Sequence, residues 1–195
     1  MKTRNKARKA RKKDGSVTGD VDLGAPTPRP PEPGGAGAGV ETTGRFIVEV
    51  PIRRALNAGT LVVAAAGNNA DRPMNPGFVE PPANSDGAVA VAALDSQLRI
   101  ARFSSRSSTL TGVGGKVNVA GPGVDVFSSV PVGRGTHAAF NGTSMATPHV
   151  AGIAALWSQA SGLSGAALWN RLIQTVRPLS IASADIGAGL VQAPQ

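Results

Sequence analysis

Apolar residues change their spacing along this chain, and the change predicts where strands and helices lie. Residues 60–66 (TLVVAAA) are apolar without interruption, which is typical of a parallel strand covered on both faces. Further short apolar runs end in Gly, Pro or Ser and predict strands at residues 88–94, 117–120 and 124–130. Together these runs predict a sheet.

Two stretches near the end of the chain have apolar residues at intervals of three and four, as one face of a helix requires. They are residues 144–160, with Val150, Ile153, Ala154 and Trp157, and residues 163–176, with Leu168, Leu172, Ile173 and Val176. Residues 51–58 start with a proline and are followed by Gly59, which predicts a short helix or the end of a longer one. Strands alternating with helices indicate an α/β class.

The first 44 residues differ in composition from the rest of the chain. A basic run is followed by a Pro/Gly tract at residues 25–39, and large apolar residues are almost lacking. Such a segment buries too little surface to offset the entropy of ordering it. We therefore expect a disordered tail at residues 1–44 and a folded domain at residues 45–195.

The net charge of +8 belongs to that tail, because eight of the 20 Lys and Arg residues lie within the first 13 positions. The twelve that remain equal the twelve acidic residues in number. We expect a solvated tail with at most weak contacts to nucleic acid; binding to nucleic acid or another anionic surface is kept as a second alternative function.

The sequence contains no cysteine, so disulfides and thiolate metal sites are excluded. No apolar run has the length that a signal peptide or a membrane span needs, and we expect no membrane association. The compartment and the oligomeric state stay unassigned.

Ser144 is the candidate for covalent chemistry. It lies in the string NGTSMATPHVAG (residues 141–152), between a loop and a helix of small residues. Free N–H groups and the positive end of the helix dipole favour negative charge there, and Gly142 and Ala146 leave room for a substrate carbonyl. From a Gly-Thr-Ser turn alone, a helix-capping serine is the more common explanation.

The whole string, however, resembles the active-serine signature of the subtilisin-like serine proteases, the subtilases. Three further segments are similar to that family: VVAAAGN at residues 62–68, RFSSRS at 102–107 and VAGPGVDVFSS at 119–129. The resemblance is to the C-terminal half of the catalytic domain and covers half to three quarters of this chain. It implies a doubly wound, mostly parallel sheet with helices on both faces, incomplete on its N-terminal side.

The resemblance also implies roles for single residues. Ser144 is expected to be the nucleophile that forms an acyl-enzyme, and Asn68 the side-chain donor of the oxyanion hole. Ala65, Ala66 and Gly67 are expected to line the primary specificity pocket. The implied substrate is a protein or peptide, and no cofactor is expected. A structural calcium ion occurs in the family, but no site for one is assignable here.

The catalytic Asp and His segments of the family are not found in this sequence. No histidine precedes Asn68, and Asp20 and Asp22 lie in the tail without a preceding strand. His137 occupies the family's strand before the serine turn and is not expected to act as base, whereas His149 is expected to be structural, packed within the helix. The sequence thus predicts a serine endopeptidase with a truncated catalytic triad. A truncated or degenerate homologue without activity is the first alternative.

Overall fold

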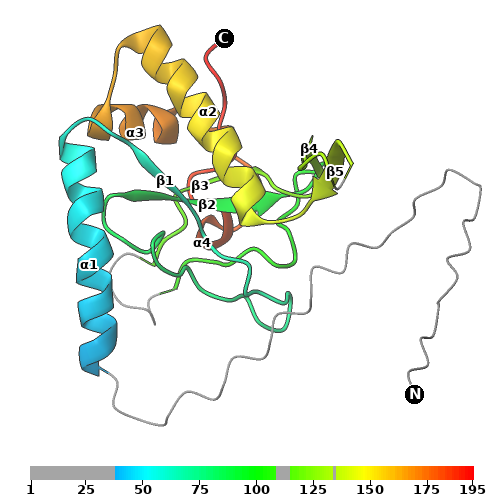
Figure 1. Cartoon of the computed structure of the whole chain (residues 1–195), viewed down its shortest axis with the longest axis horizontal. Helices are drawn as coiled ribbons and strands as arrows, with labels where there is room; N and C mark the ends of the chain where they lie inside the picture. The colour runs from blue at the N-terminus through cyan, green and yellow to red at the C-terminus, as the bar shows by residue number, and fades with distance from the viewer. Residues whose placement is uncertain (1–37, 109–114, 134) are drawn as a thin grey trace, which may run out of the picture. The chain divides into compact units, whose positions relative to one another are not determined.

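The computed structural model describes residues 38–108, 115–133 and 135–195, with side chains from residue 47 onward. Residues 37–195 form one compact unit. Its elements in chain order (Figure 1) are α1 (Ala38–Asn57), β1 (Val62–Ala65), β2 (Ala88–Leu94), β3 (Val119–Pro122), β4 (Val126–Ser129), β5 (His137–Phe140), α2 (Thr143–Ser161), α3 (Gly165–Gln174) and α4 (Ser183–Ile186).

The first three strands form a parallel sheet in the order β1-β2-β3. Val62 is in register with Ala88, and Val91 with Val119. All seven residues of β2 are buried, as a strand with neighbours on both sides and cover on both faces must be. The continuous apolar runs therefore correctly predicted parallel strands.

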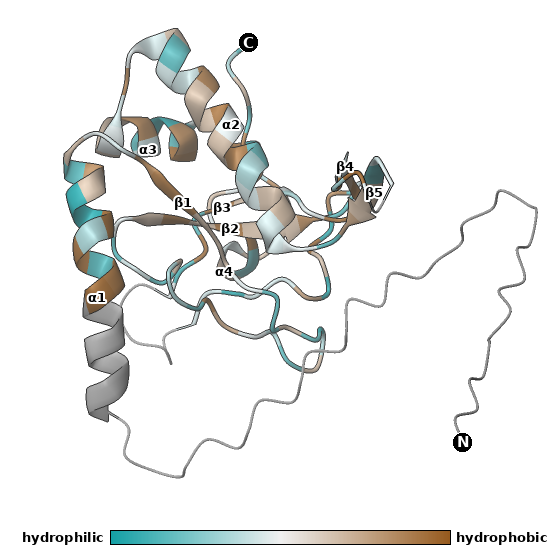
Figure 2. Ribbon diagram, in the orientation of Figure 1, coloured by the Kyte–Doolittle hydropathy of each residue, from teal (hydrophilic) through white to brown (hydrophobic). Residues whose placement is uncertain are grey.

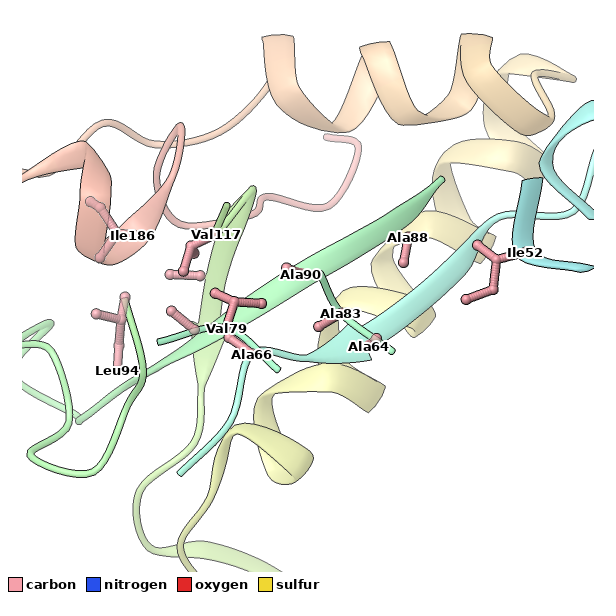
Figure 3. Close-up of a cluster of buried hydrophobic side chains, with 12 residues drawn as sticks. Ile52, Ala64, Ala66, Val79, Ala83, Ala88, Ala90, Leu94, Val117 and Ile186 are labelled. Atoms are coloured by element: carbon pink, nitrogen blue, oxygen red, sulfur yellow. The ribbon is translucent and has the colours of Figure 1, made fainter. Parts of the chain in front are cut away.

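Helices cover both faces of this sheet, as the fold class requires. One core cluster joins alternate residues of β2 with Ile52 of α1 and Ile186 of α4 (Figure 3). A second cluster joins the remaining residues of β2 with Ala146 and Val150 of α2. The β2 residues are Ala88, Ala90, Ala92 and Leu94 in the first cluster, and Val89, Val91 and Ala93 in the second. Successive side chains of one strand thus serve two separate cores.

Small residues bring α2 close to the sheet. A Cβ atom on Gly121 of β3 would lie 3.1 Å from the Ala146 carbonyl oxygen and 3.3 Å from Cγ2 of Val150. A larger side chain at this position would push the helix outward. The glycine therefore sets the height of α2, and of the serine at its start, above the sheet.

The fourth strand does not join the parallel sheet. β4 pairs antiparallel with β5 in a separate ribbon, in which Val126 is in register with Phe140 and Ser129 with His137. The chain turns out of the first sheet just before β4, where Asp125 has a φ angle of 54°. Residues 124–130 were correctly predicted as a strand, but the single sheet expected from the pattern is two.

The helix pattern is also largely confirmed. Residues 51–58 are the end of a longer helix, α1, which begins at Ala38 within the segment that composition assigned to the tail. The remainder of that tail, residues 1–37, lies outside the described residues. α2 and α3 match the two periodic stretches within two residues at each end.

The longer helices each carry hydrophobic and hydrophilic residues side by side (Figure 2). Within the described ranges, no helix combines the length and the apolar character that crossing a lipid bilayer demands.

Gly187, at the end of α4, provides a test of how the C-terminal segment is attached. Its φ angle is 62°, and an added Cβ would overlap the backbone of Asn118. The close approach lets Ala188 N donate to Asn118 O at 2.9 Å. We expect Gly187→Ala to lower the free energy of unfolding by about 2 kcal/mol or more, because strain and overlap add.

Gly152 is the matched control, since no atom lies within 4 Å of its would-be Cβ and it is inside α2. Gly152→Ala should raise the free energy of unfolding by about 0.5–1 kcal/mol. Urea unfolding monitored by circular dichroism measures both. Equal effects of the two substitutions would contradict the packing described for Gly187.

Candidate active site

Ser144 is the second residue of α2, and its side chain is exposed. Gly142 precedes the helix, and the N–H groups of Met145 and Ala146 turn back toward the Gly142 carbonyl at 3.0 and 3.4 Å. In the described part of the chain, the Ser144 N–H has no hydrogen-bond acceptor. A free N–H at the positive end of the helix dipole is suited to bind a developing negative charge.

The serine loop is attached to the carboxyl ends of β2 and β3. Gly123 N donates to Leu94 O at 2.9 Å, and Gly142 N donates to Gly123 O at 2.8 Å. A Cβ on Gly123 would lie only 2.6 Å from the Ala93 Cβ. Only glycine allows these backbones to approach so closely, and the approach places Ser144 at the edge where sites form in open α/β sheets.

Asn68 follows β1 at the same edge and is bound to the start of α2. Its Oδ1 accepts hydrogen bonds from both the N–H and the Oγ1–H of Thr143, each at 2.9 Å. Thr143 Oγ1 in turn accepts the N–H of Gly67 at 3.3 Å. With Oδ1 occupied twice, the Nδ2 group is directed away from Thr143, and it meets no acceptor among the described residues.

The two free donors border one small space. A Cβ on Gly142 would lie 3.5 Å from Asn68 Nδ2 and 3.7 Å from Ser144 N. Two N–H groups around a space next to an exposed serine hydroxyl are what a tetrahedral oxyanion requires, with donor distances of about 2.7–3.1 Å once it forms. A side chain at position 142 would occupy part of that space.

The three residues expected to line the specificity pocket differ in their surroundings. Ala66 is fully buried and its methyl group packs in the core cluster that contains Val79. Ala65 and Gly67 are half-buried. For all three residues, lining of the pocket stays a prediction.

His137 lies on β5, and its ring stacks on Phe127 of β4 with the centroids 5.0 Å apart. The other end of β5, Phe140, leads into the serine loop. Three residues of strand span about 10 Å, and no hydrogen bond joins the imidazole to Ser144 in the described part of the chain. The position agrees with the expectation that His137 is not the base.

His149 is placed no better for proton transfer. It comes five residues after Ser144 on the same helix, about 140° around the axis. Its Nδ1 is hydrogen-bonded to Met145 O at 2.8 Å, and the side chain is exposed. The side chain is exposed, so the expectation that it packs against other residues is wrong, whereas the hydrogen bond to Met145 O ties the ring to its own helix. Neither of the two histidines is placed to accept the proton of Ser144.

A cleft of about 500 Å³ opens beside the start of α2. It lies between the β4–β5 ribbon and the first two turns of the helix. Its lining comprises the four residues of β4 together with Phe140, Met145, Pro148 and His149. Across the part of the chain that the structure describes, no group of three or more His, Asp or Glu side chains could hold a metal ion.

Thr143 is a site residue that sequence reasoning did not single out. It has no exposed surface, and its backbone and hydroxyl together orient the Asn68 amide. The sequence places Thr143 immediately before Ser144, but it does not predict the hydrogen bonds to Asn68, which lies 75 residues earlier in the chain.

This chain is similar to known proteins over most of its length. The family model described as "Subtilase family" matches residues 34–189, and the chain belongs to this family of serine proteases. It is 41% identical over 153 residues to alkaline elastase YaB of Bacillus sp. (strain YaB), covering 78% of this chain and 36% of that protein. It is 39% identical over 150 residues to subtilisin DY of Bacillus licheniformis, covering 76% of this chain and 51% of that protein.

Among solved structures, the chain is similar to one titled "S41 Psychrophilic Protease", with a TM-score of 0.65 and 31% identity. The match covers 76% of this chain and 53% of that one. The chain thus has the subtilisin-like α/β fold and spans between about a third and a half of the length of the relatives described here.

Thr143 gives a direct test of how the site is held together. Thr143→Val removes the hydroxyl, which leaves the Gly67 N–H without its acceptor and Asn68 Oδ1 with one donor fewer. We expect the free energy of unfolding to fall by about 1–3 kcal/mol, the cost of a lost buried hydrogen bond. Thr143→Ser keeps the hydroxyl and should lose less. Urea unfolding measures both variants. Equal losses of unfolding free energy in the two variants would show that the hydroxyl does not stabilise the site.

Proposed function

We propose that this chain carries the nucleophile and the oxyanion hole of a serine endopeptidase that cleaves peptide bonds through an acyl-enzyme on Ser144. One observation carries the proposal: Ser144 N and Asn68 Nδ2, neither of which meets an acceptor among the described residues, border one space beside the exposed Ser144 hydroxyl. Membership of the subtilase family supports serine protease chemistry in general.

In the proposed reaction, Ser144 Oγ attacks the carbonyl carbon of the substrate, and the carbonyl electron pair moves onto oxygen. The N–H groups of Asn68 and Ser144 stabilise that oxyanion, a charge that exists only near the transition state. The amine then leaves with a proton, and water releases the acyl group from Ser144.

The Ser144 proton must pass to a base. Neither His137 nor His149 is placed to accept it, so the proposed reaction needs a base from another source, such as a partner fragment. The substrate class is protein or peptide, and the cleft lined by Phe140 and Met145 is suited to an apolar residue next to the cleaved bond. We propose no cofactor for the reaction.

A second candidate is a homologue that keeps the scaffold without turnover. The placement of both histidines favours it, because removal of the base histidine alone costs about 10⁶-fold in turnover, a value measured on a subtilisin. Binding to an anionic surface through the basic run at residues 1–13 rests on the sequence alone, since that run lies outside the described residues.

Labelling with a fluorophosphonate in the presence of free imidazole tests the proposal. Imidazole can replace a missing base, whereas nothing in solution replaces the oxyanion donors. We expect phosphonylation at Ser144, read by peptide mass spectrometry, with a rate that rises with imidazole concentration. Asn68→Ala should lower that rate by about 10²–10³-fold, the range measured on a subtilisin for loss of one oxyanion donor.

Two controls accompany this measurement. Ser144→Ala should abolish labelling, and Ser164→Ala, which removes an exposed serine at the start of α3, should leave it unchanged. Asn57→Ala serves as the matched asparagine control on the exposed end of α1. Absence of Ser144 labelling at every imidazole concentration, in a chain with native circular dichroism, would reject the endopeptidase proposal and favour the inactive homologue.

A further inference from the structure

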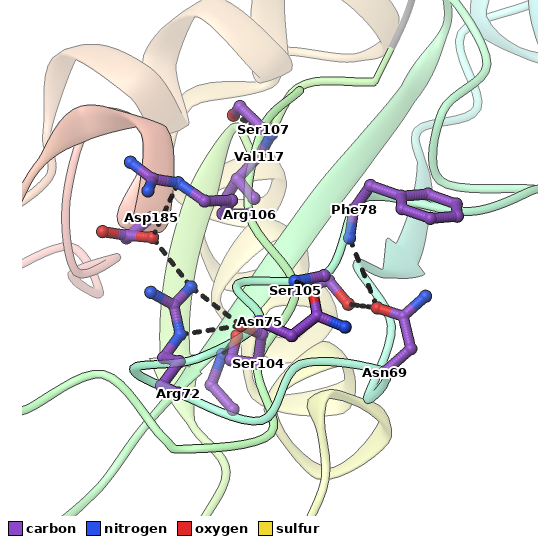
Figure 4. Close-up of polar contacts among 12 residues, drawn as sticks. Asn69, Arg72, Asn75, Phe78, Ser104, Ser105, Arg106, Ser107, Val117 and Asp185 are labelled. Carbon is purple, nitrogen blue, oxygen red and sulfur yellow. Dashed lines mark hydrogen bonds and ion pairs between the residues drawn. The ribbon is translucent and has the colours of Figure 1, made fainter. Parts of the chain in front are cut away.

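Ser105 lies beside Asn69, the residue that follows Asn68 (Figure 4), and it has no exposed surface. It belongs to the connection between β2 and β3, far from Asn68 in sequence. The catalytic proposal gives it no role. A fully buried hydroxyl in this place needs a partner, and its partners lie in the Asn68 loop.

Ser105 binds the residues on both sides of Asn68. Its N–H donates to Gly67 O at 3.1 Å, and its Oγ–H donates to Asn69 Oδ1 at 2.6 Å. Asn69 Oδ1 also accepts the N–H of Phe78 at 3.3 Å, which closes the loop upon itself. The backbone of Asn68 is therefore held at its preceding and at its following residue by one serine.

The fit between Ser105 and the loop is close. Gly67 has a φ angle of +117°, and a Cβ there would lie 2.9 Å from Ser105 Oγ. The hydroxyl thus fills the space that a side chain at position 67 would need. The absence of a side chain at Gly67 allows the loop to approach Ser105, and the hydrogen bonds of Ser105 hold the loop in that position.

The neighbouring Ser104 anchors Ser105 to the rest of the fold. Ser104 Oγ accepts the N–H of Ala93, in the central strand, at 3.1 Å. Its carbonyl oxygen accepts Nε and Nη2 of Arg72 at 3.1 and 2.9 Å, and Arg72 is paired with Asp185 of α4 at 2.7 Å (Figure 4). Ser105 is consequently held on the sheet and does not move with the exposed loop.

We propose that Ser105 is a positioning residue for the oxyanion donor: it holds Gly67 and Asn69 so that Asn68 Nδ2 stays beside Ser144 N. The inference rests on the proposed function of Asn68. Thr143 orients the amide group of Asn68. The Asn68 side chain is exposed, however, so the position of its amide also depends on the position of the Asn68 backbone. A donor must be fixed before the charge develops, and a displacement of about 1 Å costs up to 10²-fold in rate.

A double-mutant cycle separates positioning from general stabilisation. In the imidazole-dependent labelling of Ser144, Ser105→Ala should lower the rate by about 10-fold or more. In the Asn68→Ala background the same substitution should change the rate by less than about 2-fold, because the donor that it positions is already gone. A purely structural serine would lower the rate equally in both backgrounds, which would overturn the proposal.

Ser107→Ala is the matched control. Ser107 lies two residues further along the same segment, and its Oγ accepts the N–H of Val117 at 2.8 Å without contacting the Asn68 loop. It should leave labelling within about 2-fold of wild type. Asn69→Ala removes the hydrogen bond between Ser105 and Asn69 from the side of the exposed residue, and it should lower the labelling rate as much as Ser105→Ala does. This variant therefore provides the test if Ser105→Ala does not fold.

A measurement without any probe keeps this inference separate from the proposed function. The side-chain amide resonances of Asn68, assigned by their loss in Asn68→Ala, are recorded by NMR on the full chain. Ser105→Ala or Asn69→Ala should shift and broaden them, whereas Ser107→Ala should not. Unchanged Asn68 resonances in both variants would overturn the inference, even if Ser144 is labelled. If the wild-type chain is not labelled, the endopeptidase proposal fails, and the Asn68 resonances still decide the role of Ser105.

Discussion

The hydrogen bonds between Asn68 and Thr143 are the interaction on which the site depends. They join the carboxyl end of β1 to the start of α2 across 75 residues of sequence. Without them the Asn68 amide would be free to rotate, and its Nδ2 would not be held toward the Ser144 N–H. The pairing is buried on the threonine side and exposed on the asparagine side, as the proposed contact of Asn68 with substrate requires.

This pairing is possible only because small residues bring the backbones together. Gly121 lets α2 lie on β3, and Gly123 lets the end of β3 approach both Ala93 and Gly142. A core of Ala, Val and Gly buries less apolar area per residue than one rich in Leu and Phe, so its stability depends on close packing. The same closeness fixes the height of Ser144 above the sheet edge.

The proposed site has two donors for a developing charge, but neither histidine is placed beside Ser144 to accept its proton. The two donors can stabilise an oxyanion, while the two histidines are occupied elsewhere, His137 with Phe127 and His149 with the backbone of α2. Oxyanion stabilisation and proton transfer are separate contributions to catalysis, and a chain can retain one without the other. Chemical replacement of the base therefore reveals what the remaining site can do.

The sequence by itself determined the elements and the chemistry-bearing residues. Continuous apolar runs located β1 and β2, helical periodicity located α2 and α3, and a twelve-residue motif singled out Ser144, because each of these signals is local. Tertiary structure decided the rest: the separation of β4 and β5 from the parallel sheet, the burial of the Ala66 methyl, the exposed ring of His149, and the contacts of Thr143 and Ser105 with the Asn68 loop. These features depend on contacts between segments that are far apart in sequence, and the spacing of residues along the chain does not predict such contacts.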